Sequence, residues 1–290
     1  EKALSLAKKG DFSGFDYIDD FNNGFAKVEL NNKCNLIDTN GNFISKQWFN
    51  YIDNFDENGI AQVSLNHKWN LIDINGNFLS QQLFDYVYSF DKNGIAKVYL
   101  NHKWNLIDTN CKLVSQQWFD YVSNFDENGI AKVMLNNKYN FIDVNGNLLS
   151  KQWFDCIYNF NKNGIAIVEL NDKYNLIDVN GKLISRQWFD DIDDFDENGL
   201  AKVELNNKLN FIDVNGKLVY KQWLDYISSF KNSFARVELN RKWNLIRTDG
   251  NFLSKQWFDW ISVFKNGFAQ VKLNNKWNLI GTDGNLLFKQ

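Results

Sequence analysis

The stretch Gly59-Ile60-Ala61-Gln62-Val63-Ser64-Leu65-Asn66 decides the fold of this 290-residue chain. Its side chains alternate: Ala61, Val63 and Leu65 point to one face, and polar side chains point to the other. Alternation with a period of two is typical of an antiparallel strand that is buried on one face and wet on the other. We therefore expect a half-buried strand here.

The same pattern recurs eight times along the chain. An alanine occupies the same place in every copy: Ala26, Ala61, Ala96, Ala131, Ala166, Ala201, Ala235 and Ala269. Self-similarity at a fixed period is the signature of a repeat architecture. The sequence thus predicts an all-β protein of eight tandem antiparallel β repeats of about 35 residues. No linker interrupts the series, so we expect a single repeat domain over residues 15–290. The lead-in at 1–14 fits the end of a preceding helix that stops at Gly10.

Outward from the first strand, the rest of one repeat is expected to form three further strands. A turn at His67-Lys68 leads into a second strand over residues 69–73. The pair Asn75-Gly76 accepts positive φ at low cost and predicts a tight turn. A short third strand is expected at 78–80 and a fourth at 83–87.

Two arrangements of the eight repeats remain open. A wet face on the first strand favours an open, superhelical, solenoid-like array in which each repeat contacts only its neighbours. The alternative is a closed eight-bladed β-propeller, because the chain begins with an expected fourth strand at 15–18 and ends with an expected third strand at 286–288. In a closed ring, the N-terminal strand supplies the strand that the last blade lacks.

Two residue types hold the same place in nearly every copy. An asparagine follows the residue that opens the second strand in all eight: Asn35, Asn70, Asn105, Asn140, Asn175, Asn210, Asn244 and Asn278. Asparagine tolerates left-handed backbone best after glycine, so we expect positive φ or a β-bulge at these positions. The second fixed position, which we assign to the core, holds Phe49, Phe84, Phe119, Phe154, Phe189, Leu224 and Phe258.

On these residues, the unit resembles the WG repeat, a β-rich repeat common in bacterial proteins. The resemblance rests on Gly59-Ile60-Ala61 followed by Val63, on Lys68-Trp69-Asn70-Leu71-Ile72-Asp73 and on Gly76, and it extends over residues 15–288. Asparagine stands where the WG pattern has its signature glycine. The resemblance implies a repeat scaffold, often joined to other domains, without a common enzymatic activity.

Composition and charge argue against several classes of function. A net charge of −3 disfavours wholesale nucleic-acid binding, and no run approaches the roughly 18 apolar residues of a membrane span. Cys34, Cys111 and Cys156 occupy three different places in the repeat, which indicates neither a disulfide framework nor a zinc site. His67 and His102 have no nucleophile to pair with. We expect no enzymatic activity and no cofactor.

Repeated Asp-x-Asn-Gly turns and 11 tryptophans invite interpretation as ligand sites. The turn at Asp73 lacks the ligand spacing of a calcium loop, so hairpin chemistry explains it better. Most tryptophans fall at two fixed positions, one of which also accepts Leu209 and Cys34. That tolerance favours packing in the core over stacking on a sugar. Trp260 shares its position with Asp191, so we expect it to be exposed.

Charge is distributed unevenly. Residues 220–290 carry 11 Lys and Arg against 5 Asp and Glu, while acidic side chains concentrate at 190–197. Arg236, Arg241 and Arg247 are unusual in a chain that otherwise prefers lysine, and the guanidinium fork pairs carboxylates or phosphates bidentately. With Trp260 they are expected to bind an acidic protein surface or anionic polymer. The leading hypothesis is a non-enzymatic scaffold for protein–protein interaction, and the alternative is a lectin-like carbohydrate-binding protein.

Overall fold

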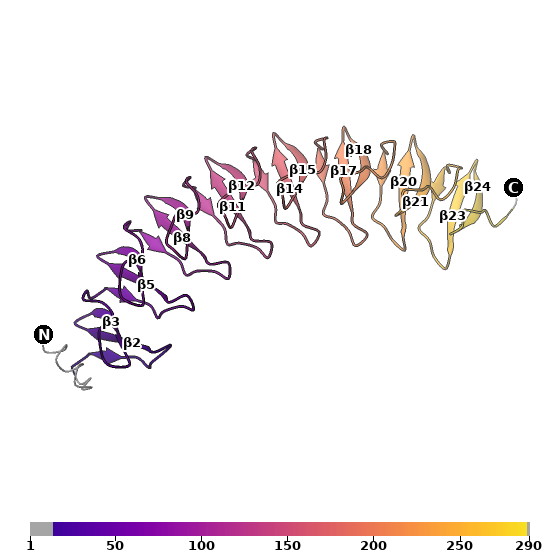
Figure 1. Cartoon of the computed structure of the whole chain (residues 1–290). Coiled ribbons are helices and arrows are strands. Elements are labelled where there is room, and N and C mark those ends of the chain that lie inside the picture. The colour runs from indigo at the N-terminus through magenta and orange to yellow at the C-terminus, as the bar shows by residue number, and fades with distance from the viewer. Residues whose placement is uncertain (1–13, 289–290) are drawn as a thin grey trace. The chain divides into compact units, whose positions relative to one another are not determined.

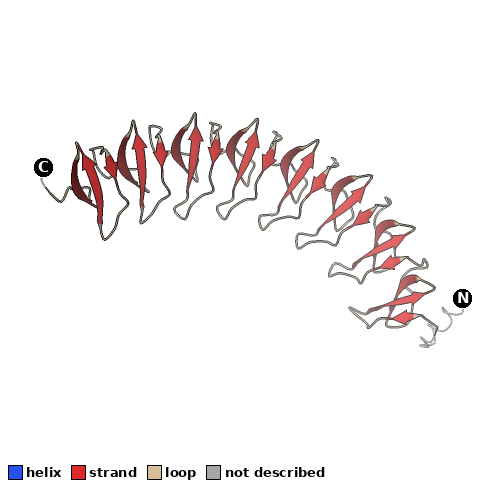
Figure 2. Ribbon diagram, turned by 180° about the vertical axis from the view of Figure 1, so that it is seen from behind, coloured by secondary structure: helices blue, strands red, loops and turns tan. Residues whose placement is uncertain are grey.

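The computed structural model describes residues 14–288, and this part of the chain is all-β. Its 24 strands form eight three-stranded antiparallel sheets, one per repeat, and none of them closes into a barrel. Figure 2 shows strands and loops only in the described part. Nothing in residues 14–288 has the length and apolar character of a membrane-spanning helix. The helix end expected before Gly10 lies outside the described residues.

Two compact units divide the chain, Glu1–Trp153 and Phe154–Gln290, here called the N-terminal unit and the C-terminal unit. Each unit contains four of the sheets. Within each unit the sheets follow one another in chain order (Figure 1). The single repeat domain expected over residues 15–290 remains a prediction.

Each sheet contains one short strand and two long ones. The short strands are β1 (Tyr17–Ile18), β4 (Tyr51–Ile52), β7 (Tyr86–Val87), β10 (Tyr121–Val122), β13 (Cys156–Ile157), β16 (Asp191–Ile192), β19 (Tyr226–Ile227) and β22 (Trp260–Ile261). The first long strands are β2 (Phe25–Leu30), β5 (Ile60–Leu65), β8 (Ile95–Leu100), β11 (Ile130–Leu135), β14 (Ile165–Leu170), β17 (Leu200–Leu205), β20 (Phe234–Leu239) and β23 (Phe268–Leu273). The second long strands are β3 (Lys33–Asp38), β6 (Lys68–Asp73), β9 (Lys103–Asp108), β12 (Lys138–Asp143), β15 (Lys173–Asp178), β18 (Lys208–Asp213), β21 (Lys242–Arg247) and β24 (Lys276–Gly281).

The two long strands form the hairpin that the alternating pattern predicts. In the second repeat, β5 pairs with β6 in a register that ends at Leu65↔Lys68. The turn is Asn66-His67, one residue earlier than expected, and both residues have positive φ, 49° and 63°. Two successive positive-φ residues make the type I′ turn, whose twist matches a two-residue hairpin.

The third and fourth strands depart from the expected repeat. Phe78 forms only an isolated bridge to Ile72 in place of a third strand. Phe84 exchanges two backbone hydrogen bonds with Trp69, of 2.8 and 2.9 Å, at the outer edge of β6. The next residues form β7, which pairs with β8 of the following repeat. The segment 84–87 therefore crosses from one sheet to the next and joins them.

The same connection at the start of the chain removes the argument for a closed ring. β1 pairs with β2, with Tyr17 opposite Glu29, and completes the first sheet. It is not a strand displaced from the last repeat, as the eight-bladed alternative required. Each sheet also has three strands, not the four of a propeller blade. The fold is a tandem series of open three-stranded sheets.

The second face of the long strands is less exposed than expected: polar side chains such as Gln62 and Lys97 are half-buried, and the apolar side chains beside them are packed. Ile60 and Leu71 lie on that face of the second sheet, are 7% and 1% exposed, and pack against Phe84, Val87 and Ala96 of the third repeat. Contacts of this kind stack neighbouring sheets within each unit. The core assignment of the fixed phenylalanines is confirmed, because Phe84 and its described equivalents are at most 1% exposed.

The eight fixed asparagines have ordinary β backbone, so the expected positive φ or bulge was wrong. Asn70 pairs with Val63 in an uninterrupted register, and neither it nor any equivalent has positive φ. Its buried side chain donates to Ser80 O at 2.8 Å, and its Oδ1 accepts from Leu71 N at 2.7 Å. The amide replaces the backbone partners that β6 lacks where the chain leaves its edge after Leu79.

The glycine of the Asn-Gly turn serves a contact between repeats. Gly76 has φ +75°, and a Cβ added to it would lie 2.1 Å from the carbonyl oxygen of Ile44 in the preceding repeat. Gly146 approaches Val114 in the same way. Cys111 takes this place in the third repeat with φ 58°, and burial raises the pKa of its thiol to about 12. Glycine is needed here because the turn is left-handed and a neighbouring backbone touches it.

A row of ion pairs also links consecutive repeats. Lys68 Nζ pairs with Asp85 Oδ1, and Asn101 N donates to Asp85 Oδ2 at 2.8 Å, so one carboxylate joins the second and third repeats. The Lys68 ammonium and the Asn101 amide hold the pKa of Asp85 below its ordinary value. Equivalent pairs are Lys103–Asp120, Lys173–Asp190, Lys208–Asp225 and Lys242–Asp259.

Candidate binding surfaces

Most of the residues at the two fixed tryptophan positions pack against the core, as expected, but the indoles are not fully buried. The phenylalanines of the preceding subsection fill the space between stacked sheets, and the larger indoles lie at the flanks. Trp277 is 60% exposed. The half-buried members are Trp48, Trp69, Trp104, Trp118, Trp153, Trp188, Trp223, Trp243 and Trp257.

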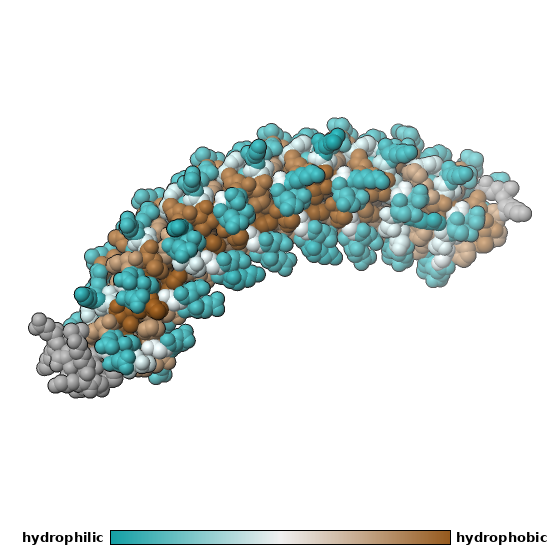
Figure 3. Space-filling model, viewed as in Figure 1, coloured by the Kyte–Doolittle hydropathy of each residue, from teal (hydrophilic) through white to brown (hydrophobic). Residues whose placement is uncertain are grey.

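In the N-terminal unit, rings from the second and third repeats join into one contiguous row. This aromatic strip consists of Tyr51, Trp69, Tyr86, Tyr88, Trp104 and Tyr99. Successive ring centroids lie 5.3 Å (Tyr51–Trp69), 4.9 Å (Trp69–Tyr86), 4.7 Å (Tyr86–Tyr88), 5.7 Å (Tyr88–Trp104) and 4.8 Å (Trp104–Tyr99) apart. The three tyrosines Tyr51, Tyr86 and Tyr88 are 40%, 39% and 40% exposed. Figure 3 shows strongly hydrophobic side chains (brown) reaching the surface of the N-terminal unit, whereas tyrosine and tryptophan are pale because they lie near the middle of the hydropathy scale.

Strand register builds the strip. Tyr86 of β7 lies opposite Tyr99 of β8, and Tyr99 lies opposite Trp104 of β9, so three rings stand side by side on one face of the third sheet. The periodicity of the sequence does not reveal this cluster, because it does not give the register between strands. The available signal was Tyr99, since the other repeats place Glu29, Ser64, Met134, Glu169, Glu204, Glu238 and Lys272 there.

Two lysines extend the strip with positive charge. Lys27 Nζ lies 5.6 Å from the ring centroid of Tyr51. Lys97 Nζ lies 5.0 Å from that of Tyr88 and 5.8 Å from that of Trp104. Cations at these distances are attracted by the negative face of an aromatic ring. The strip therefore combines exposed rings with cationic edges.

A pocket recurs between neighbouring repeats, and its size and charge differ from copy to copy. Its walls are the first long strand of one repeat, the second long strand beside it, and the segment that follows the next short strand. The cavity measures about 450 Å³ between the third and fourth repeats and about 370 Å³ between the sixth and seventh. It shrinks to about 70 Å³ between the second and third.

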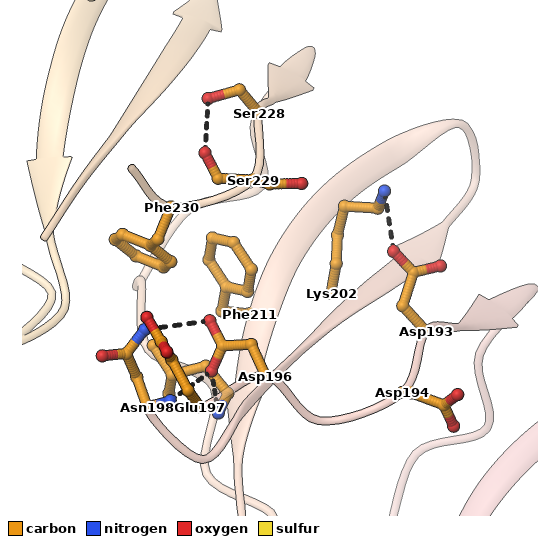
Figure 4. A pocket seen from close by; sticks show the side chains of 11 residues that line it. Asp193, Asp194, Asp196, Glu197, Asn198, Lys202, Phe211, Ser228, Ser229 and Phe230 are labelled. Atoms are coloured by element: carbon orange, nitrogen blue, oxygen red, sulfur yellow. Dashed lines mark hydrogen bonds and ion pairs between the residues drawn. The ribbon is translucent and has the colours of Figure 1, made fainter. Parts of the chain in front are cut away.

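The pocket between the sixth and seventh repeats is acidic (Figure 4). Lys202 Nζ forms an ion pair with Asp193 Oδ2 at 2.8 Å, and Asp196 Oδ1 accepts from Asn198 N at 2.8 Å. Within residues 14–288, no group of three His, Cys, Asp or Glu side chains is arranged to hold a metal ion. The pocket's charged lining residues are Asp193, Asp194, Asp196, Glu197 and Lys202.

Of the predicted partner-binding residues, the structure brings Arg236 close to the strand of Trp260. Arg236 Nη1 donates to Ile261 O at 3.4 Å, and its guanidinium lies 5.0 Å from the ring centroid of Trp243. Trp260 is 36% exposed, as expected, and its ring meets that of Trp277 edge-on at 5.4 Å. Arg236 thus stabilises the contact between two repeats.

The other two arginines lie at opposite ends of the β20–β21 hairpin. Arg241 is in the turn, with φ 61°. Arg247 ends β21, where its Nη2 donates to Thr282 O at 2.8 Å and its guanidinium lies 5.9 Å from the ring centroid of Phe234. The structure therefore does not gather the three arginines into one cluster.

Comparison with known proteins points to a repeat family. The family model described as "WG containing repeat" matches eight consecutive segments of the chain. They are residues 14–34, 36–69, 71–104, 106–139, 141–174, 176–208, 211–243 and 245–277. No curated protein matches the chain.

Solved structures offer only distant likenesses. The chain is similar to Hsv2p of Kluyveromyces lactis, at 10% identity over 79% of this chain and 92% of that one, with a TM-score of 0.29. It is also similar to the extracellular domain of the hybrid two-component system BT3049 of B. thetaiotaomicron, at 10% identity over 95% of this chain and 45% of that one, with a TM-score of 0.32. Likenesses this weak carry no argument about this protein.

Proposed function

The chain belongs to the WG containing repeat family, and from that premise we propose that it is a non-enzymatic scaffold that binds a protein partner through the aromatic strip. Soluble proteins rarely expose contiguous apolar patches unless the patches bind something. Tyrosine and tryptophan dominate the energetically important positions of protein interfaces, because a large ring is buried at a small cost in side-chain entropy. The contiguous rings from Tyr51 to Trp104 are the observation that carries this proposal.

The repeated polar residues support a role without catalysis, because they are engaged in building the fold. Asp73 Oδ1 accepts from Asn75 N and Asn77 N, both at 2.9 Å, and so closes a turn. Asn70 holds a loop against β6, and Asp85 joins two repeats. Backbone hydrogen bonds stabilise the charged form of a carboxylate and lower the pKa of Asp73, which makes it a weaker general base.

The orientation of the rings favours a protein over a carbohydrate. Successive rings of the strip are inclined to one another by 52°, 58°, 70°, 41° and 49°. Consecutive sugars of one chain stack best on rings that present roughly coplanar faces. Inclined rings form an uneven surface, which suits the side chains of a protein.

Photo-cross-linking tests the proposal directly. Benzoylphenylalanine placed at Tyr86 is expected to capture a protein from the source cells. The same probe at Tyr158, which occupies the position of Tyr88 in its own repeat and is 48% exposed, serves as the matched control. The captured protein, once purified, is expected to bind the Tyr86→Ala/Tyr88→Ala variant at least tenfold more weakly and the Tyr158→Ala variant unchanged.

Two results would contradict the proposal. One is a loss of binding in the Tyr158→Ala variant as large as in the Tyr86→Ala/Tyr88→Ala variant, because the aromatic strip would then not be the specific binding site. The other is reproducible binding on a glycan array that disappears with Trp260→Ala, which would support the lectin-like alternative. Trp260 and Trp277 are the exposed ring pair of the C-terminal unit and the natural site for such binding.

A further inference from the structure

The pocket between the third and fourth repeats differs from its copies in holding a lysine without a counter-ion. Its cavity of about 450 Å³ belongs wholly to the N-terminal unit. Lys97 projects from the middle of β8, and Tyr88, which also belongs to the aromatic strip, follows β7 beside it. The lining residues are Tyr88, Ser89, Phe90, Asp91, Lys92, Ile95, Lys97, Leu106, Ser123, Asn124 and Phe125.

The Lys97 ammonium is half-buried and bonded only to neutral groups. Its Nζ donates to Asn124 Oδ1 at 2.7 Å and otherwise faces the rings of Tyr88 and Trp104. Burial lowers its pKa below the ordinary lysine value. In the described part of the chain, no carboxylate pairs with it.

Two of the equivalent lysines in other repeats are neutralised by this chain's own side chains. Lys202 pairs with Asp193 at 2.8 Å, and Lys27 pairs with Glu29 at 3.0 Å. Asp91 lines the Lys97 pocket, but its Oδ1 accepts from Asn93 N at 2.8 Å and from Ile95 N at 3.1 Å. The Asp91 carboxylate is thus held by the turn, and the cation in the pocket stays unpaired.

We propose that this lysine pocket binds the carboxylate of an Asp or Glu side chain of a peptide segment that lies along the aromatic strip. The inference rests on the proposed function and names one feature of the partner. A carboxylate that enters meets a cation already stripped of part of its water, and the surrounding rings strengthen the resulting charge-assisted hydrogen bond by excluding solvent. Tyr88, shared by strip and pocket, makes the two surfaces continuous.

The test uses a pair of blocked pentapeptides, acetyl-Gly-Gly-Glu-Gly-Gly-amide and the same peptide with Gln in place of Glu. The full chain is labelled with ¹³C-lysine, and the Lys97 ¹³Cε signal is assigned by its loss in Lys97→Arg. Titration with the Glu peptide is expected to shift this signal to saturation, while the Gln peptide binds at least tenfold more weakly. Lys202, already paired with Asp193, is the internal control and is expected not to respond.

Two variants show whether the lysine is responsible. Gln62 and Ile167 occupy the Lys97 position in other repeats, so Lys97→Gln and Lys97→Ile are expected to fold. Neither is expected to bind the Glu peptide, as measured by the amide shifts of the pocket residues. Equal affinity for the Glu and Gln peptides, or unchanged binding in both variants, overturns the proposal.

A third probe distinguishes a carboxylate of a peptide from a carboxylate of an acidic sugar. A glucuronic-acid disaccharide that shifts Lys97 when the Glu peptide does not would assign the pocket to an acidic sugar and overturn the peptide proposal. The proposal for the pocket and the proposal for the strip are tested independently of each other. Loss of the peptide response leaves cross-linking at Tyr86 intact, and loss of cross-linking leaves the Lys97 titration intact.

Discussion

At the scale of single residues, the fixed asparagine shows how one side chain completes a sheet edge. Asn105 is fully buried, donates to Ser115 O at 2.9 Å and accepts from Leu106 N at 2.7 Å. A third strand would supply these two partners, but the chain leaves the edge of β9 before it can. Asparagine carries both a donor and an acceptor at the required reach, which the signature glycine of the family does not.

Asn105→Ala is expected to lower the free energy of unfolding by about 2–4 kcal/mol, because a buried carbonyl and a buried amide each lose their partner. Asn105→Gly is expected to cost at least as much. Asn101→Gly is the control: Asn101 lies in a hairpin turn with φ 49°, where glycine is tolerated. Denaturant unfolding of the three variants measures the difference. A stable Asn105→Gly variant would contradict the structural role of the amide.

At the scale of elements, backbone contacts join the repeats alongside the ion pairs and the apolar packing. The segment 84–87 hydrogen-bonds to one sheet and then to the next, and turn glycines such as Gly76 and Gly146 touch the backbone of the repeat before them. The hairpins alone do not provide these links. Stability of the series is therefore expected to depend on the turns as much as on the strands.

Comparing Gly76→Ala with Gly24→Ala separates two costs of replacing a turn glycine, the cost of left-handed backbone and the cost of a clash with the preceding repeat. Gly24 has φ +85° with open space around it, so its replacement is expected to cost about 1–2 kcal/mol for left-handed backbone alone. Gly76→Ala is expected to cost distinctly more, since its Cβ would lie 2.1 Å from Ile44 O. Thermal unfolding of both variants measures the difference. Equal losses of stability in the two variants would mean that the contact between Gly76 and Ile44 has room for a Cβ.

The ion pairs between repeats predict loss of stability in acid. The folded-state pKa of Asp85 lies below the ordinary value of about 3.9. Its contribution is therefore fully present above that value and is lost as the pH falls through the lower folded pKa. The free energy of unfolding is expected to hold above pH 5 and to decline below pH 4.

Asp85→Asn isolates one of these pairs. Asn50 already occupies this position in another repeat and accepts from Asn66 N at 2.9 Å, so the variant is expected to keep the backbone hydrogen bond and lose only the Lys68 pair. Its unfolding free energy is expected to be lower at pH 7 and to decline less steeply in acid. An unchanged pH profile would show that Asp85 contributes nothing through its charge.

At the scale of the whole molecule, the two units carry different surfaces. The N-terminal unit holds the aromatic strip and the lysine pocket, and the C-terminal unit holds the acidic pocket and the three arginines. The arginine patch expected from the sequence remains a prediction for partner binding. Arg236 and Arg247 also bond to neighbouring repeats, so their charge reversal is not a clean test of binding.

Arg241→Glu is the clean test, because Arg241 lies in a hairpin turn, away from the contacts between repeats made by Arg236 and Arg247. It is expected to leave the thermal midpoint unchanged and, if the patch binds an acidic partner, to weaken binding and flatten its salt dependence. Arg236→Glu is expected to cost about 1 kcal/mol of stability through the lost contacts with Ile261 O and Trp243. Equal stability of the two variants would contradict the structural role of Arg236.

The sequence by itself determined the repeat, the long strands, the tight turn at Gly76 and the phenylalanine core. These follow from periods of two and of about 35 residues, which are properties of the chain read in order. Tertiary structure alone decided that 84–87 joins two sheets, that the second strand face is partly covered, and that Asn70 is an ordinary strand residue. It also assembled the strip from Tyr86, Tyr99 and Trp104. The alternation of apolar and polar side chains predicts to which face of its strand a side chain points. Which neighbour covers that face depends on how the sheets stack.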